Sequence, residues 1–187
     1  KPSSFIASAR YYEQDGIYRV GDEKFRQLNA RAKGTVNITK WLTVENNTDF
    51  VRRSYHQPTT YAQNLLVRRN LEHQGFPITR VTNPDGTWTG TPIYNFNPLA
   101  SIKALGRNST HDRTLQANFQ LKERLDFLVE GLYLSEAMSL SSWTRDGASN
   151  TRNYSRWLDG VQQTTDNDTP YTRGEDSGQN QWTWQHY

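Results

Sequence analysis

The chain has 187 residues, of which 22 are Lys or Arg and 19 are Asp or Glu, giving a formal net charge of +3. It contains no cysteine, which excludes disulfide scaffolds, cysteine-ligated zinc, iron–sulfur clusters and thiol nucleophiles. Only 34% of the residues are hydrophobic, so one large dry core is not expected, and the small net charge argues against nucleic acid as a partner. Because the sequence starts at Lys1 and not at methionine, we interpret it as a processed product or a piece of a longer protein.

Alternation of apolar and polar residues is the strongest pattern along the chain. A two-residue period is typical of strands with one apolar and one polar face. In chain order the predicted strands are 4–13, 24–38, 41–54, 113–122, 125–140 and 179–187. The alternation is clearest in the second and fourth of these and ambiguous in the fifth. The sequence therefore predicts an all-β fold of about six antiparallel strands.

The connections between the predicted strands differ greatly in length. Two connections are short, Thr39-Lys40 and Glu123-Arg124, whereas the loops at about 55–108 and 141–177 are long. In an antiparallel meander every second connection lies at the same edge, so one edge carries tight turns and the other long loops. This asymmetry is typical of an outer-membrane β-barrel. A soluble sheet with one solvated face alternates equally well, but loops this long are uncommon in compact domains.

A tilted strand needs roughly 9–11 residues to cross the hydrocarbon layer. The apolar positions from Leu28 to Ile38 cover a segment of this length. We therefore expect one face of the sheet to contact outer-membrane lipid and the other an aqueous lumen. The residues expected to face lipid are Leu28, Ala30, Ala32, Val36, Ile38, Leu115, Ala117, Phe119 and Leu121. An open sheet edge in lipid leaves backbone groups unpaired, so these strands are expected to be part of a large transmembrane β-barrel.

Several short motifs together carry a resemblance to a known family. They are Ser8–Tyr18, Phe25–Ala32, Thr39–Leu42, Phe76-Pro77, Asn83–Gly86 and Asn97–Ala100. Because the motifs occur in this order and spacing, most of the chain from residue 5 to residue 135 resembles the barrel region of SusC/RagA-type TonB-dependent outer-membrane transporters.

The resemblance implies a barrel of about 22 strands with an N-terminal plug, in the outer membrane of a Gram-negative bacterium. It implies a SusD-like surface lipoprotein as a lid and oligosaccharides or peptides as imported substrates. It also implies the TonB complex as the source of energy, acting through the plug. We find no plug domain in residues 1–187, so gating and TonB coupling are assigned to no residue of this sequence.

Aromatic and arginine residues in the two predicted long loops are the candidate ligand residues. Such side chains stack on sugar rings and donate hydrogen bonds to polar polymers. The candidates for substrate or lid contact are Trp88, Tyr94, Trp143, Trp157 and Arg145. The alternative role is packing of the loops against each other. Near the strand ends, Trp41, Tyr55 and Trp182 or Trp184 are expected in an interfacial aromatic girdle, and a short helix is predicted at 59–74.

Patterns of catalytic and metal-binding residues are largely missing. We find no phosphate-binding loop, nucleophile elbow, paired-histidine zinc motif or dinucleotide fingerprint, so an enzyme is not expected. No cofactor or metal site is expected either. Asp166 and Asp168 offer oxygen ligands for a loop calcium ion, but they lack the spacing of a twelve-residue calcium loop, which favours a solvated acidic turn. The sequence thus predicts a segment of transporter barrel wall, with a soluble all-β carbohydrate-binding surface module as the alternative.

Overall fold

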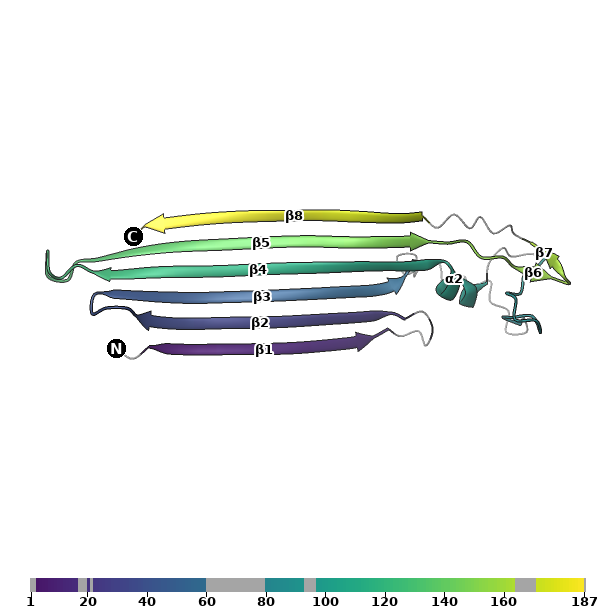
Figure 1. Cartoon of the computed structure of the whole chain (residues 1–187), viewed down its shortest axis with the longest axis horizontal. Coiled ribbons are helices and arrows are strands. Elements are labelled where there is room, and N and C mark those ends of the chain that lie inside the picture. Colours follow the sequence, from purple (N-terminus) through teal and green to yellow (C-terminus); the bar gives the residue numbers. More distant parts are fainter. Residues whose placement is uncertain are drawn as a thin grey trace.

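The computed structural model describes residues 3–16, 20, 22–59, 80–92, 97–163 and 171–186. Six long strands form one antiparallel sheet in the order β1-β2-β3-β4-β5-β8 (Figure 1). They are β1 (Ser4–Asp15), β2 (Lys24–Asn37), β3 (Leu42–Pro58), β4 (Gly106–Arg124), β5 (Tyr133–Thr151) and β8 (Tyr171–His186). A helix, α2 (Pro98–Ala104), and a small hairpin of β6 (Trp157–Leu158) and β7 (Val161–Gln162) lie at one end of the sheet. The prediction of an all-β antiparallel fold is confirmed.

The long strands pair in an uninterrupted register. The pairing of β4 with β5, for example, runs from Gly106 opposite Thr151 to Arg124 opposite Tyr133. Each of these two strands has 19 residues, which corresponds to about 60 Å at the usual rise per residue. Strand β4 is therefore much longer than the predicted segment 113–122, whereas β5 is shifted towards the C-terminus from the predicted segment 125–140.

Short and long connections lie at opposite ends of the sheet, as predicted (Figure 1). The turn between β2 and β3 is short because the side chain of Thr39 accepts hydrogen bonds from the backbone N–H groups of Trp41 and Leu42, at 3.2 and 2.9 Å. The predicted tight turn at Glu123-Arg124 is wrong. These residues belong to β4, and the turn to β5 occupies 125–132, where Gly131 has a φ of 80°.

The predicted loop boundaries also need correction. Residues 141–151 lie in β5 and residues 171–177 lie in β8, so only the middle of the predicted 141–177 loop connects strands. The expectation that Trp143 and Arg145 belong to a loop is therefore wrong. This part of β5 is rich in Ser, Thr, Ala and Gly, whose small side chains leave only a weak alternation of apolar and polar positions. The 55–108 loop is also shorter than predicted, because β3 continues to Pro58 and β4 begins at Gly106.

The register separates the sheet into an apolar face and a polar face, because residues directly opposite in an antiparallel pair point to the same side. Ala30 lies opposite Phe50, which lies opposite Leu115. The pairing therefore places eight of the nine residues expected to contact lipid on one side of the sheet, together with Trp182 and Trp184. The ninth, Ile38, lies in the turn that follows β2 and is outside this register. Both tryptophans are 65% exposed. We call this side the apolar face.

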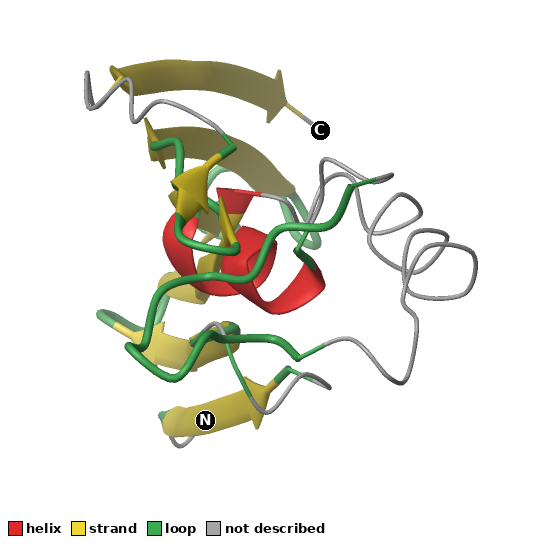
Figure 2. Cartoon of the chain, turned by 90° about the vertical axis from the view of Figure 1, so that its right-hand side faces the viewer, coloured by secondary structure: helices red, strands yellow, loops and turns green. Residues whose placement is uncertain are grey.

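Nothing in the described part of the chain packs against the apolar face. The buried apolar residues in these segments are Ala100, Ile102 and Ala117, and the first two belong to α2. Figure 2, which views the molecule from the loop end, shows α2 in front of the strand ends and not over the length of the sheet. No described helix has the length and apolar composition needed to cross a membrane. The described residues thus lack the central apolar core of a typical soluble domain.

Helix α2 was not predicted, and its start is set by local chemistry. The side chain of Asn97 accepts a hydrogen bond from the backbone N–H of Ala100 at 3.1 Å, and Pro98 occupies the first turn, where a missing N–H costs nothing. The helix predicted at 59–74 lies outside the described residues, except for Thr59 at its beginning.

Candidate functional site

The polar face carries a ladder of hydrogen bonds between side chains of neighbouring strands. Arg31 pairs with Asp49 at 3.3 Å and Lys122 with Glu45 at 2.8 Å. Farther along, neutral pairs continue the pattern, with Ser139 donating to Asn118 at 2.8 Å and Ser149 to Asn108 at 2.6 Å. Most of these side chains are exposed, and they satisfy one another along the length of β2 to β5.

One ion pair near the loop end of this face is more buried than the rest. Arg145 of β5 donates two hydrogen bonds to the carboxylate of Asp112 on β4, from Nε at 2.6 Å and from Nη2 at 2.7 Å. Asp112 is only 6% exposed. The hydrogen bonds from Arg145 hold the pKa of Asp112 below its ordinary value, against the opposing effect of burial. The carboxylate thus fixes the orientation of a guanidinium on the polar face.

The guanidinium of Arg145 also lies near an aromatic side chain. Its central carbon is 5.4 Å from the centre of the Trp143 ring, two residues earlier on the same strand and the same face. Two nitrogens of the guanidinium bond Asp112, and an arginine has further N–H donors. Trp143 and Arg145 therefore present an aromatic surface and hydrogen-bond donors side by side.

A second aromatic group lies on the same face and was not predicted as a site. Phe25 of β2 lies between Tyr55 of β3 and Tyr12 of β1, with ring centres 4.9 and 6.0 Å away. Tyr55 therefore belongs to the polar face and not to an outward girdle. The alternation of faces along β2 and β3 could have revealed this placement, since Phe25 and Tyr55 fall on the same side as Gln27 and Arg53.

We call these residues together the polar-face site: Tyr12, Phe25, Tyr55, Asp112, Trp143 and Arg145. The register places Tyr12, Asp112 and Arg145 in one row across the sheet, and Tyr55 is in the next row. Aromatic rings stack on the apolar faces of sugar rings and on peptide planes, and a fixed guanidinium donates to hydroxyl, carbonyl or carboxylate oxygens. This arrangement is suited to holding a polar polymer and contains no nucleophile paired with a base.

The two loop tryptophans among the sequence candidates lie together, beyond the sheet. The backbone N–H of Trp157 donates to the carbonyl of Trp88 at 2.8 Å, and both side chains are half-buried. Their segments pack around Asn97, whose side-chain amide donates to the carbonyls of Val81 and Thr89 at 2.8 and 3.1 Å. We call this packed unit, residues 80–92, 97–105 and 152–163, the loop module.

The structure thus divides the five candidates between two places. Trp143 and Arg145 are in the polar-face site, and Trp88 and Trp157 are in the loop module. Tyr94 lies outside the described residues, as do Asp166 and Asp168 of the calcium hypothesis. Among the residues that are described, no group of three or more His, Asp or Glu is arranged to hold a metal ion.

No protein-family model matches the chain, and no curated protein matches it.

Proposed function

We propose that this chain is part of the wall of a transmembrane β-barrel, in a TonB-dependent outer-membrane transporter of the SusC/RagA type. The observation that carries the proposal is the uncovered apolar face of a long antiparallel sheet, backed by a polar face with its own side-chain network. In this proposal the apolar face contacts lipid and the polar face lines the lumen.

The dimensions of the apolar face support a membrane location. From Leu28 to Asn37, the last residue of β2, the chain rises about 30 Å, which at a tilt of about 40° spans about 23 Å along the membrane normal. This is close to the height, about 25 Å, of the apolar band of outer-membrane barrels. Beyond Leu28 the same face becomes charged, with Arg26 and Lys24 following in the next two rows.

Several polar residues lie within the apolar band, and two on β3 give further support because they are hydrogen-bonded to each other. Asn46 and Thr48 of β3 lie on the apolar face, opposite Phe119 and Ala117. The hydroxyl of Thr48 donates to the side-chain carbonyl of Asn46 at 2.9 Å. Because an unpaired polar group in hydrocarbon is costly, this mutual hydrogen bond is the arrangement expected of polar residues in a lipid-facing strand.

The sheet edges favour a closed barrel over an isolated sheet. In the described residues, β1 pairs only with β2 and β8 pairs only with β5, so each presents an unpaired edge. In lipid such edges require a neighbouring strand. Further strands on both sides would close the wall, and the long connections would then lie together on the extracellular side.

The proposed activity is import of oligosaccharides or peptides, captured with a SusD-like surface lipoprotein as a lid. The polar-face site supports this because it places Trp143 and Arg145 on the proposed lumen wall, near the entrance. Energy input from TonB acts through a plug domain outside these residues.

Spin labels test the orientation of the wall. In membranes of cells producing the protein, labels at Ala30 and Phe119 should be relaxed by oxygen, and labels at the adjacent Asn29 and Asn118 by a water-soluble nickel complex. The reverse pattern would refute the proposal. A protein that is monomeric and cooperatively folded in detergent-free buffer would instead support the soluble carbohydrate-binding module.

A further inference from the structure

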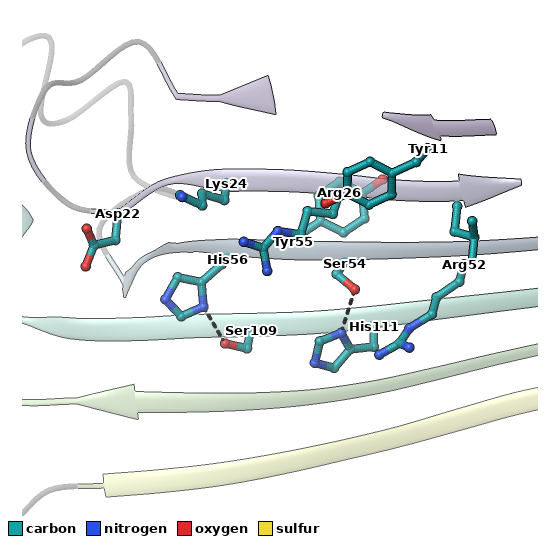
Figure 3. Close-up of a pocket in the computed structure, with 11 residues that line it drawn as sticks. Tyr11, Asp22, Lys24, Arg26, Arg52, Ser54, Tyr55, His56, Ser109 and His111 are labelled. Atoms are coloured by element: carbon teal, nitrogen blue, oxygen red, sulfur yellow. Dashed lines mark hydrogen bonds between the residues drawn. The ribbon is translucent and has the colours of Figure 1, made fainter. Parts of the chain in front are cut away.

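The apolar face contains a hollow just beyond its apolar band, towards the loop end. Its volume is about 560 Å³, and it is lined mainly by residues of β1 to β4 (Figure 3). Those that matter here are Tyr11, Leu28 and Arg52, which form one row on the membrane side, and Arg26, Lys24 and His111 beyond that row. The hollow thus joins an apolar rim to a group of basic side chains.

Arg52 has an unusual electrostatic environment. Its direct cross-strand partner is Arg113, and like charges directly opposite each other destabilise a sheet. Arg113 has a counter-charge in Asp146, at 2.9 Å, whereas Arg52 contacts no carboxylate in the described part of the chain. Figure 3 shows Arg52 extending towards the ring of His111, whose Nδ1 is hydrogen-bonded to Ser54 at 3.0 Å. An anion at Arg52 would relieve this repulsion.

The other charges around the hollow are already paired. Glu13 lies 3.3 Å from Arg26 and 3.8 Å from Lys24, Asp15 also lies 3.8 Å from Lys24, and Asp22 lies 2.7 Å from Arg107. The acidic residues therefore neutralise the outer cations and leave the positive charge of Arg52 uncompensated, in the same row as Leu28. This is the depth at which the apolar band ends.

A second hollow, of about 460 Å³, lies directly on the membrane side of the first. It is a shallow groove on the same face, formed where small side chains of neighbouring strands meet, and its lining on this face comprises Ala7, Ala9, Ala30, Ala32, Thr48 and Phe50. Ser8 and Arg31, which have the parity of the polar face, also line it. Ala9 lies opposite Ala30, and Ala30 is two residues from Leu28 of the first hollow. The groove leads into the apolar band from the point where the basic hollow ends.

We propose that these two hollows together bind one anionic lipid, with a head-group phosphate at Arg52 and an acyl chain in the alanine groove. The inference rests on the proposed membrane location of the apolar face. An arginine with no carboxylate partner is suited to a phosphate, which accepts two parallel hydrogen bonds from a guanidinium. The adjoining groove accepts an unbranched apolar chain, and its position below the arginine matches the order of head group and tail in a membrane leaflet. Free phosphate would account for the first hollow only.

The test is native mass spectrometry of the detergent-purified protein with three probes: phosphatidic acid, phosphatidylcholine with the same acyl chains, and inorganic phosphate. We expect phosphatidic acid to bind at least about tenfold more tightly than phosphatidylcholine, because only its exposed phosphate pairs with Arg52 without a choline cation. The variant Arg52→Gln should remove this preference. The matched control is Arg53→Gln, since Arg53 is the next residue but lies on the polar face, hydrogen-bonded to Gln27 at 3.1 Å.

A second variant tests the groove. Ala30→Leu fills it and should weaken binding of both lipids, whereas Leu140→Phe, on the same face but outside the groove, should not. Equal binding of phosphatidic acid to wild type and Arg52→Gln would overturn the lipid site, and so would inorganic phosphate competing as well as the lipid. If spin labels confirm the wall orientation while these variants have no effect, the lipid site alone fails. The reverse label pattern would remove the basis of both proposals.

Discussion

Arg145 and Asp112 face each other across β5 and β4 and form a two-point ion pair, with N–O distances of 2.6 and 2.7 Å. The carboxylate is nearly buried, while 48% of the arginine side chain is exposed. The pair lies on the loop side of the apolar band, where the polar face carries its aromatic groups. Its contribution to the free energy of unfolding can therefore be compared with that of the more exposed ion pairs on the same face.

Replacing Asp112 with Asn should destabilise the folded protein by about 1–2 kcal/mol, because Arg145 loses its charged partner while remaining partly desolvated. Because the arginine is half-exposed, the loss of stability is smaller than the cost of breaking a fully buried pair. The measurement is urea-induced unfolding in detergent micelles. Glu45→Gln is the matched control, since the Lys122–Glu45 pair is exposed on both sides and should contribute less than about 1 kcal/mol. Equal effects of the two variants would contradict this assignment.

Acidic pH should remove the stabilisation that the Arg145–Asp112 ion pair provides. The pKa of Asp112 is lowered in the folded protein from an ordinary value of 3.8, mainly by the hydrogen bonds from Arg145. A lowered folded-state pKa means that the stabilisation is fully present above pH 3.8 and is lost as the pH falls through the folded-state pKa. The free energy of unfolding of the wild type should therefore fall more steeply than that of Asp112→Asn below about pH 4. Parallel curves for the two proteins would show that the pair does not contribute.

A charge placed on the apolar face should prevent insertion. Phe119→Arg puts a guanidinium within the apolar band and should cost about 2–4 kcal/mol if that residue faces lipid. Gln116→Arg is the control, because Gln116 is on the polar face directly opposite Asp49 and gains a partner there. The folded fraction in vesicles, measured by resistance to heat denaturation in SDS gels, should drop only for Phe119→Arg. Loss of folding in both variants, or in neither, would argue against two differently solvated faces.

Much of the sheet could be predicted from the sequence because of its alternation. Leu28 to Val36 and Leu115 to Leu121 alternate strictly with polar residues, and a one-residue slip in register would move every side chain to the other face. The pattern weakens in β5, where Ser139, Ser141 and Ser142 occupy both faces. There the pairing with β4 and β8 keeps the segment extended, which local periodicity does not reveal.

The polar-face site was only partly predictable. Residue type identifies Trp143 and Arg145 as an aromatic and basic pair, but the prediction that they lie in a loop is wrong because β5 extends to Thr151. Asp112 could not be predicted as their partner, since 33 residues separate it from Arg145 and only the strand register brings them together. The cluster around Phe25 likewise depends on three strands. Residue type indicated the chemistry, and pairing across the sheet determined its location.

Asn97 should be the most sensitive residue of the loop module. It is 4% exposed, caps α2 through its side-chain oxygen and bonds two carbonyls through its amide nitrogen. Asn97→Ala should destabilise the module by about 1–3 kcal/mol, because the cap and the partners of two carbonyls are lost together. Hydrogen exchange of the amides at 88–90 and 157 should accelerate while exchange in β4 stays unchanged. Asn97→Asp, which keeps only the capping oxygen, should give an intermediate effect. Unchanged exchange in Asn97→Ala would show that the loops are held by other contacts.

The different positions of the candidate tryptophans lead to the last prediction. Trp143 lies on the proposed lumen wall beside the fixed guanidinium of Arg145, whereas Trp157 is half-buried in the loop module with its backbone bonded to Trp88. Trp143→Ala should therefore weaken substrate binding by about tenfold, the loss expected for one stacked ring, and leave folding intact. Trp157→Ala should mainly loosen the loops and raise their protease sensitivity. The measurement is calorimetric titration with a panel of defined oligosaccharides and peptides, using the ligand that the wild-type protein binds most tightly.

The combined alanine variant of Trp88, Tyr94, Trp143 and Trp157 should lose both substrate capture and lid association. If that variant binds ligand and lid as the wild type does, these aromatic residues serve only packing, and recognition belongs to other parts of the proposed transporter.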